Sequence, residues 1–131
     1  MSDGRHPWFI DRAATTWRTR LDDALADAAQ SGRRAFVLMA RATRGGSRAL
    51  VEKTIAKEEI AEYLNRHFVA VAADADAPDP TLAALLPSLP KRDPTPLCVY
   101  LAPDGRVLLS TAGGRPAAVF LNDLIEAHSK K

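Results

Sequence analysis

Residues 35–48 read AFVLMARATRGGSR, an unbroken apolar run followed by basic residues and a Gly-Gly pair. An apolar run of this length predicts a strand that is covered on both faces. The Gly-Gly pair interrupts the pattern, and over residues 47–56 the apolar side chains of Leu50, Val51 and Ile55 recur at helical spacing. The stretch therefore predicts a strand, a glycine-containing loop and a helix in direct succession.

The segment upstream of this stretch predicts a first helix, because small and apolar residues repeat at helical spacing from Leu21 onward. Thr19 is expected to be the N-cap of this helix. Asp22 and Asp23 follow in the first turn, where negative charge favours the helix dipole. Gly32 is expected to end the helix.

Apolar runs and turn residues alternate downstream of residue 56. The last helix is expected to have Pro116 at its first position and to place Val119, Phe120, Leu124 and Ile125 on one buried side. The other expected elements are a short strand at Trp17, a helix from Lys57 with Ile60, Tyr63 and Leu64 on one face, a helix at 81–86, strands at 68–73, 97–101 and 106–110, and a turn at 102–105.

This order of elements predicts an α/β fold, with helices covering a mixed sheet whose inner strands are parallel and whose last two strands form an antiparallel hairpin. At 131 residues the chain has the length of one domain. We expect residues 1–13 to form an N-terminal arm and residues 14–131 to form the domain.

Composition excludes several classes of function. The chain is 47% apolar and 26% charged, with a formal net charge of +2. This charge is too small to predict nucleic-acid binding. No apolar run approaches the roughly 20 residues that a membrane span needs. The first ten residues lack the apolar core of a secretory signal, so we expect a cytoplasmic protein without a membrane partner.

Cysteine and histidine are both scarce. The only cysteine, Cys98, lies in an apolar run and is expected to be a buried small side chain. A single cysteine cannot form a disulfide within the chain. His6, His67 and His128 show no spacing typical of metal ligands, so we predict no metal site and no cofactor.

The order of elements, with a helix-opening motif after the first long strand and Pro96 directly before the hairpin, resembles the thioredoxin-like superfamily. The small bacterial thioredoxin-related domains are the most similar group. The segments that carry the resemblance are Trp17 with residues 21–28, the strand 36–42, residues 55–74 and residues 95–105. It implies a three-layer α/β/α sandwich.

The same resemblance implies that the redox site is degenerate. The family's nucleophilic cysteine falls on Arg44, its resolving cysteine on Ser47, and the preceding tryptophan on Thr43. The buried acid that accepts a proton falls on Leu38. The cis proline of the family falls on Pro96. Because disulfide exchange needs a thiolate, we expect no thiol–disulfide oxidoreductase activity and no catalytic residue.

What remains of the site predicts a redox-inactive module that binds a protein or an extended peptide, with an acidic partner favoured by the arginines. We expect no nucleic-acid partner and make no prediction of the oligomeric state. The degenerate loop is Thr43, Arg44, Gly45, Gly46 and Ser47, and the candidate groove is Arg41, Arg44, Arg48, Thr95, Pro96, Gly113 and Gly114.

Two alternatives remain open from the sequence. One is a glutathione- or anion-binding, transferase-like enzyme centred on Ser47 and the Arg44–Arg48 loop. The other is single-thiol chemistry at Cys98.

Overall fold

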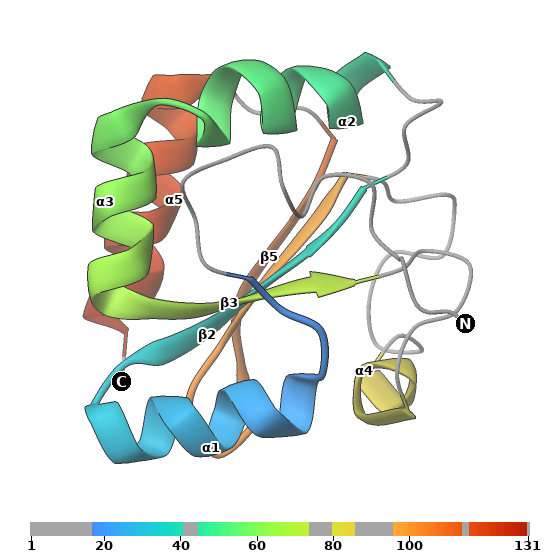
Figure 1. Ribbon diagram of the computed structural model, residues 1–131, viewed down its shortest axis with the longest axis vertical. Coiled ribbons are helices and arrows are strands. Elements are labelled where there is room, and N and C mark those ends of the chain that lie inside the picture. The colour runs from blue at the N-terminus through green and yellow to red at the C-terminus, as the bar shows by residue number, and fades with distance from the viewer. Residues whose placement is uncertain (1–16, 41–44, 74–79, 86–95, 114–115, 131) are drawn as a thin grey trace.

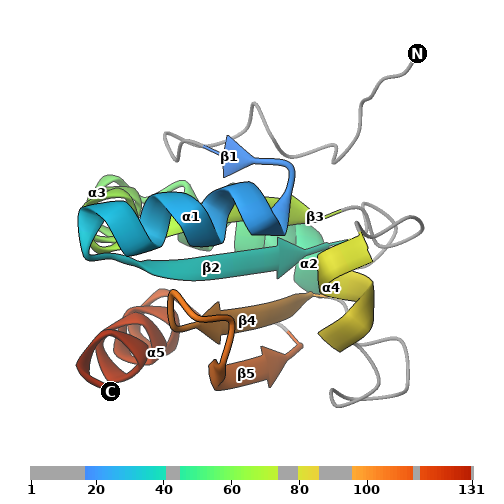
Figure 2. The same cartoon turned by 90° about the horizontal axis from the view of Figure 1, so that it is seen from below.

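A five-stranded mixed sheet runs through the protein, whose computed structural model describes residues 17–40, 45–73, 80–85, 96–113 and 116–130. The expected arm (1–13) and several loop residues lie outside these ranges. The strand order is β1-β3-β2-β4-β5, with β1, β3 and β2 parallel and β4 and β5 antiparallel to their neighbours. Figure 2 shows the strands stacked in this order. The strands are β1 Trp17–Arg18, β2 Arg34–Met39, β3 Phe68–Ala73, β4 Leu97–Leu101 and β5 Val107–Ala112.

Helices cover both faces of this sheet, so the three-layer α/β/α arrangement is confirmed (Figure 1). The helix α1 and the short α4 lie on one face, and α2, the π-helix η1, α3 and α5 lie on the other. The helices are α1 Leu21–Ser31, α2 Gly45–Ala49, η1 Leu50–Ile55, α3 Glu58–His67, α4 Pro80–Leu85 and α5 Ala117–Ser129.

The apolar runs of the central strands supply both cores, because successive side chains of a strand point to opposite faces. In β2, Phe36 and Leu38 join the core under η1, α3 and α5, whereas Val37 and Met39 join the core under α1 and α4. All five of the residues 35–39 are buried. The unbroken apolar pattern of this strand therefore reflects a strand with no solvent-facing side.

The hairpin between β4 and β5 forms at the predicted turn. The Ala102 N–H donates to the Arg106 carbonyl at 2.9 Å, and the Gly105 N–H donates to the Ala102 carbonyl at 2.8 Å. Gly105 has φ +92°, a conformation that glycine adopts without steric cost. The second strand begins one residue later than expected, at Val107, and continues to Ala112.

The start of α1 differs from the prediction. Thr19 is not the N-cap, because the helix begins at Leu21 and Arg20 occupies the cap position with extended backbone and no side-chain cap hydrogen bond. The Arg20 guanidinium instead bonds Asp22 at 3.0 Å. This contact is the largest cause that lowers the pKa of Asp22 below its ordinary value. Asp22 and Asp23 both lie in the first turn of α1, as predicted.

The helix after the glycine pair also differs from the prediction. It begins at Gly45 rather than Ser47, and its second half, η1, has π-helical hydrogen bonding. The predicted inward residues Leu50, Val51 and Ile55 are nonetheless all buried. A π-helix has a wider turn than an α-helix. In η1 this wider turn places Thr54 against the core together with the three apolar residues.

The buried side of α5 was predicted incorrectly at two residues. Phe120 and Leu124 are fully buried, but Val119 is 38% exposed and Ile125 is 45% exposed. Asp123 and Ala127 take their places in the core face. The buried set thus follows i, i+3, i+4, i+7 from Phe120, and a charged residue lies inside it. Pro116 is the residue just before the helix, not its first residue.

The corrected face of α5 gives a first prediction. Leu124→Ala should lower the free energy of unfolding by about 2–5 kcal/mol, because it empties a filled site in the core. Ile125→Ala should change it by less than about 1 kcal/mol, because nearly half of that side chain already contacts water. Urea unfolding of the two variants measures both values. Equal losses would show that Ile125 faces the core after all.

Candidate functional site

Three predicted site segments meet at one end of the sheet. Strand pairing places Met39, at the end of β2, opposite Leu97, at the start of β4. Leu97 in turn lies opposite Ala112, at the end of β5. Ala40 follows β2, Pro96 precedes β4 and Gly113 follows β5, so all three lie at the same end of the sheet. We call this the site end of the sheet. Figure 1 shows the start of α2 at this same end.

A hydrogen bond joins two of the predicted groove residues directly. The Gly113 N–H donates to the Pro96 carbonyl at 2.9 Å, which extends the β4–β5 ladder by one step. Gly113 has φ +94°, so a side chain at this position would strain the backbone. Pro96 is buried, directly before β4. Pro96 and Gly113 are therefore neighbours at this end of the sheet.

The degenerate loop is described from Gly45 onward. Gly45 is exposed and begins α2, whose start lies at the site end of the sheet (Figure 1). Arg48 is exposed and pairs with Glu52 one turn later, with 3.6 Å between nitrogen and oxygen. The residues that the structure describes do not include several predicted site residues: Arg41, Thr43, Arg44, Thr95, Gly114 and the side chain of Ser47.

The only cysteine of this chain lies away from the site surface. Cys98 is fully buried in β4, as the sequence predicted. Its partner across the sheet is Leu38, which is also fully buried and is the residue to which the resemblance assigns the family's proton-accepting acid. Both residues belong to the apolar core under η1, α3 and α5. Neither a second sulfur nor a carboxylate is present at these two positions.

The structure brings together two histidines that the sequence left separate. His67 ends α3 and His128 lies in the last turn of α5, and their ring centroids are 4.2 Å apart. The Tyr63 hydroxyl lies 3.3 Å from Nδ1 of His128. Each histidine lies in the last turn of its helix, and the two helices pack side by side. The spacing of histidines along the sequence does not show this, because it does not show which helices are neighbours. Among the described residues no three histidine, cysteine or acidic side chains form a metal site.

The histidine pair predicts a pH-dependent stability. Burial, then the nearby His128 and Arg66, lower the pKa of His67 below its ordinary 6.5. The folded state therefore binds fewer protons at His67 than the unfolded state, so stability rises with pH. The contribution is complete above about 6.5 and is lost as pH falls through the lowered pKa. Urea unfolding between pH 8 and 5 measures this slope.

His67→Gln is the control for that measurement, because it removes the titrating ring and keeps a polar side chain. The variant should show a shallower loss of stability between pH 6.5 and 5 than the wild type. An unchanged slope would contradict a role for His67.

Within the described ranges, no helix is both long and apolar enough to cross a membrane. A comparison with functionally curated protein sequences gave no match. Solved structures do match. A thioredoxin from Thermus thermophilus is 23% identical, with a TM-score of 0.73 and coverage of 89% of both chains.

Two further structures show the same fold at lower similarity. The DsbH oxidoreductase is 15% identical with a TM-score of 0.65, over 98% of this chain and 93% of that one. The disulphide isomerase from Xylella fastidiosa Temecula1 is 21% identical with a TM-score of 0.56, over 82% of each chain.

A family model described as thioredoxin-like matches residues 16–103, which include β1 through β4 and the degenerate loop. The sequence contains one cysteine, so it has no CxxC motif. This chain therefore belongs to the thioredoxin-like family, as a member that has lost the two-cysteine redox site.

Proposed function

We propose that this protein is a redox-inactive binding module that holds an extended, acidic segment of a partner protein at the site end of the sheet. The observation that carries the proposal is the register of β2, β4 and β5. It places Pro96 and Gly113 at the end of the sheet where α2 begins, and the only cysteine of the chain, Cys98, is buried within β4.

Backbone groups and charge support recognition of an extended peptide. A strand end next to a proline and a glycine offers main-chain groups to a peptide that runs alongside. Arg41, Arg44 and Arg48 precede or begin the helix in sequence, and an arginine pairs with carboxylates through two parallel hydrogen bonds. Arg48 already contacts a carboxylate, that of Glu52, which a partner's acid would replace.

A cytoplasmic location is part of this proposal. The single buried cysteine supports it, because domains of oxidising compartments commonly carry disulfides. Fractionation of host cells with an antibody against the chain tests it, and recovery in an extracellular or periplasmic fraction would contradict it.

The proposal is tested by affinity capture from the host with three forms of the protein. Wild type should retain a specific partner, and Arg44→Glu should reduce its recovery at least about tenfold, because it reverses a charge at the contact. Arg106→Glu is the matched control, because Arg106 is exposed in the hairpin at the opposite end of the sheet. Equal recovery by all three forms would contradict the proposal.

Ser47→Ala separates this function from the glutathione alternative. A binding module should tolerate the change, because no hydroxyl chemistry is involved. Retention of wild type on immobilised glutathione, lost in Ser47→Ala, would favour the transferase-like alternative instead.

A further inference from the structure

A second hollow lies beside the site end of the sheet, where α2 and η1 approach the start of α5 (Figure 1). It is a groove of about 510 Å³ between the end of α2, η1 and the first turn of α5. This volume is within the range of small-molecule sites. Among the described site residues, Gly45, Pro96 and Gly113 do not line it.

The wall of the groove is mainly apolar. Leu50 and Thr54 are buried and form its base, and Ala49, Pro116 and Ala117 form its sides. The Leu50–Thr54 part of the wall belongs to the π-helix η1, and its wider turn places these side chains differently from those of an α-helix. Small side chains on both flanks leave space that a larger residue would occupy.

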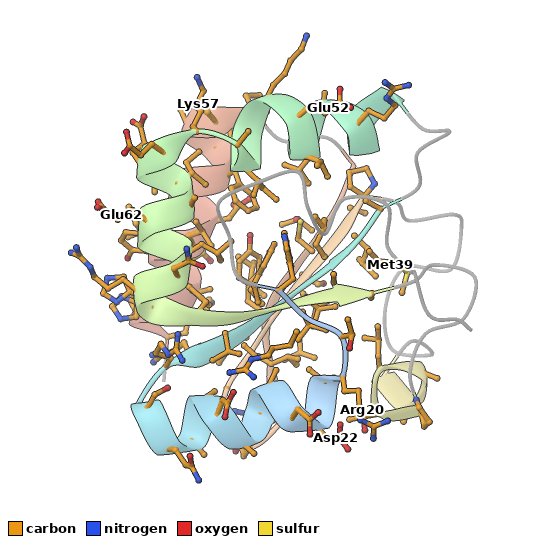
Figure 3. The ribbon with its side chains drawn as sticks, in the orientation of Figure 1. Arg20, Asp22, Met39, Glu52, Lys57 and Glu62 are labelled. Atoms are coloured by element: carbon orange, nitrogen blue, oxygen red, sulfur yellow. The ribbon has the colours of Figure 1, made fainter. Side chains whose placement is uncertain are left out.

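Two lysines flank this apolar wall. Lys53 and Lys57 both line the groove and are exposed. Within the described part of the chain, neither ammonium group makes an ion pair. The neighbouring acid Glu52 is engaged by Arg48 at 3.6 Å. Figure 3 shows Lys57 projecting outward where η1 meets α3.

The first turn of α5 adds positive potential on the opposite side of the groove. Pro116 caps this helix without a side-chain hydrogen bond, and the first turn contains no acidic residue. The partial positive charge of the helix start is therefore uncompensated within its own turn. An apolar base between two lysines and this helix start is complementary to a molecule with an apolar body and one negative group.

We propose that this groove binds a small amphipathic carboxylate, with its apolar body on Leu50, Ala49 and Ala117 and its carboxylate between Lys53 and Lys57. Burial of the body removes apolar surface from water, and the charged hydrogen bonds orient the acid. The inference does not rest on the peptide-binding proposal, because none of the described site residues Gly45, Pro96 and Gly113 lines the groove.

Octanoate is the probe, and two molecules that each carry half of its chemistry are the comparison. Octanol has the apolar body without the charge, and acetate has the charge without the body. Octanoate should bind with a Kd on the order of 1 mM. It should shift the amide NMR signals of Leu50, Lys53 and Ala117, and octanol and acetate should bind at least about tenfold more weakly. Octanol binding as tightly as octanoate would overturn the proposal, as would shifts confined to other residues.

Charge variants assign the carboxylate to the two lysines. Lys53→Met and Lys57→Met should each weaken octanoate binding about threefold to tenfold, and less so in high salt. Lys130→Met is the matched control, because Lys130 is paired with Glu126 at the end of α5. Ala49→Leu should abolish binding by filling the groove, and its circular dichroism should match that of wild type. Unchanged affinity in Lys53→Met and Lys57→Met, or an equal loss in Lys130→Met, would overturn the proposal.

Discussion

Replacing Arg44 and Ser47 together by cysteine should give a protein that reduces insulin disulfides, whereas the wild type should show no turnover. The two replacements install a CxxC motif at the positions that the resemblance to the family implies for the two cysteines. The helix that begins at Gly45 provides unpaired N–H groups that stabilise a thiolate. The double variant should therefore exceed the wild-type background at least roughly tenfold.

Its activity should remain below that of a complete family site. The resemblance places the family's proton-accepting acid at Leu38, and the side chain of Leu38 is fully buried among apolar residues. A leucine cannot accept the proton of the resolving thiol. The double variant should accordingly lose activity faster than a complete family member as pH falls.

Single variants complete this experiment. Arg44→Cys alone has one thiol at the site and should not turn over, because the mixed disulfide finds no resolving cysteine. Cys98 cannot replace it, since its side chain is fully buried. Turnover by the wild type would contradict the loss of redox chemistry, and a folded but inactive double variant would contradict the placement of the site.

Phe36→Ala should be the most destabilising single change, lowering the free energy of unfolding by about 3–5 kcal/mol. Phe36 is fully buried in β2, and its ring contacts three others. The ring centroids lie 6.4 Å from Trp17, 5.2 Å from Tyr100 and 5.7 Å from Phe120. One truncation thus loosens β1, β4 and α5 together.

Phe36→Leu is the graded control, because it keeps an apolar side chain of moderate size. It should lose substantially less stability than Phe36→Ala. Thermal unfolding should show a fall in Tm of about 10–20 °C for the alanine variant. A loss below about 1 kcal/mol for Phe36→Ala would mean that this ring cluster does not hold the sheet to α5.

Local signals in the sequence were sufficient where one segment decides its own conformation. The apolar runs of β2, β3 and β4 predicted buried strands, and residues 102–105 predicted the hairpin turn. An unbroken apolar run and the residues of a turn each extend over only a few positions, so both can be recognised without knowing the fold.

Helix faces and caps were less predictable, because partners distant in sequence decide them. Asp123 lies in the buried face of α5, whereas the predicted face contained only apolar residues and included the exposed Ile125. Thr19 has the right chemistry for an N-cap, but the helix begins one residue too late to use it. The intrinsic preferences of single residues indicate where a helix could begin and which face could be buried, but packing against the rest of the protein decides both.

By itself, the sequence determined the order of elements, the family and the absence of a two-cysteine site, because these depend on residue type and position along the chain. Tertiary structure alone decided that His67 meets His128, that Pro96 bonds Gly113, and that two lysines flank an apolar groove against α5. Each of these contacts joins residues from different elements. Such pairs come together only when strand register and helix packing bring their elements side by side.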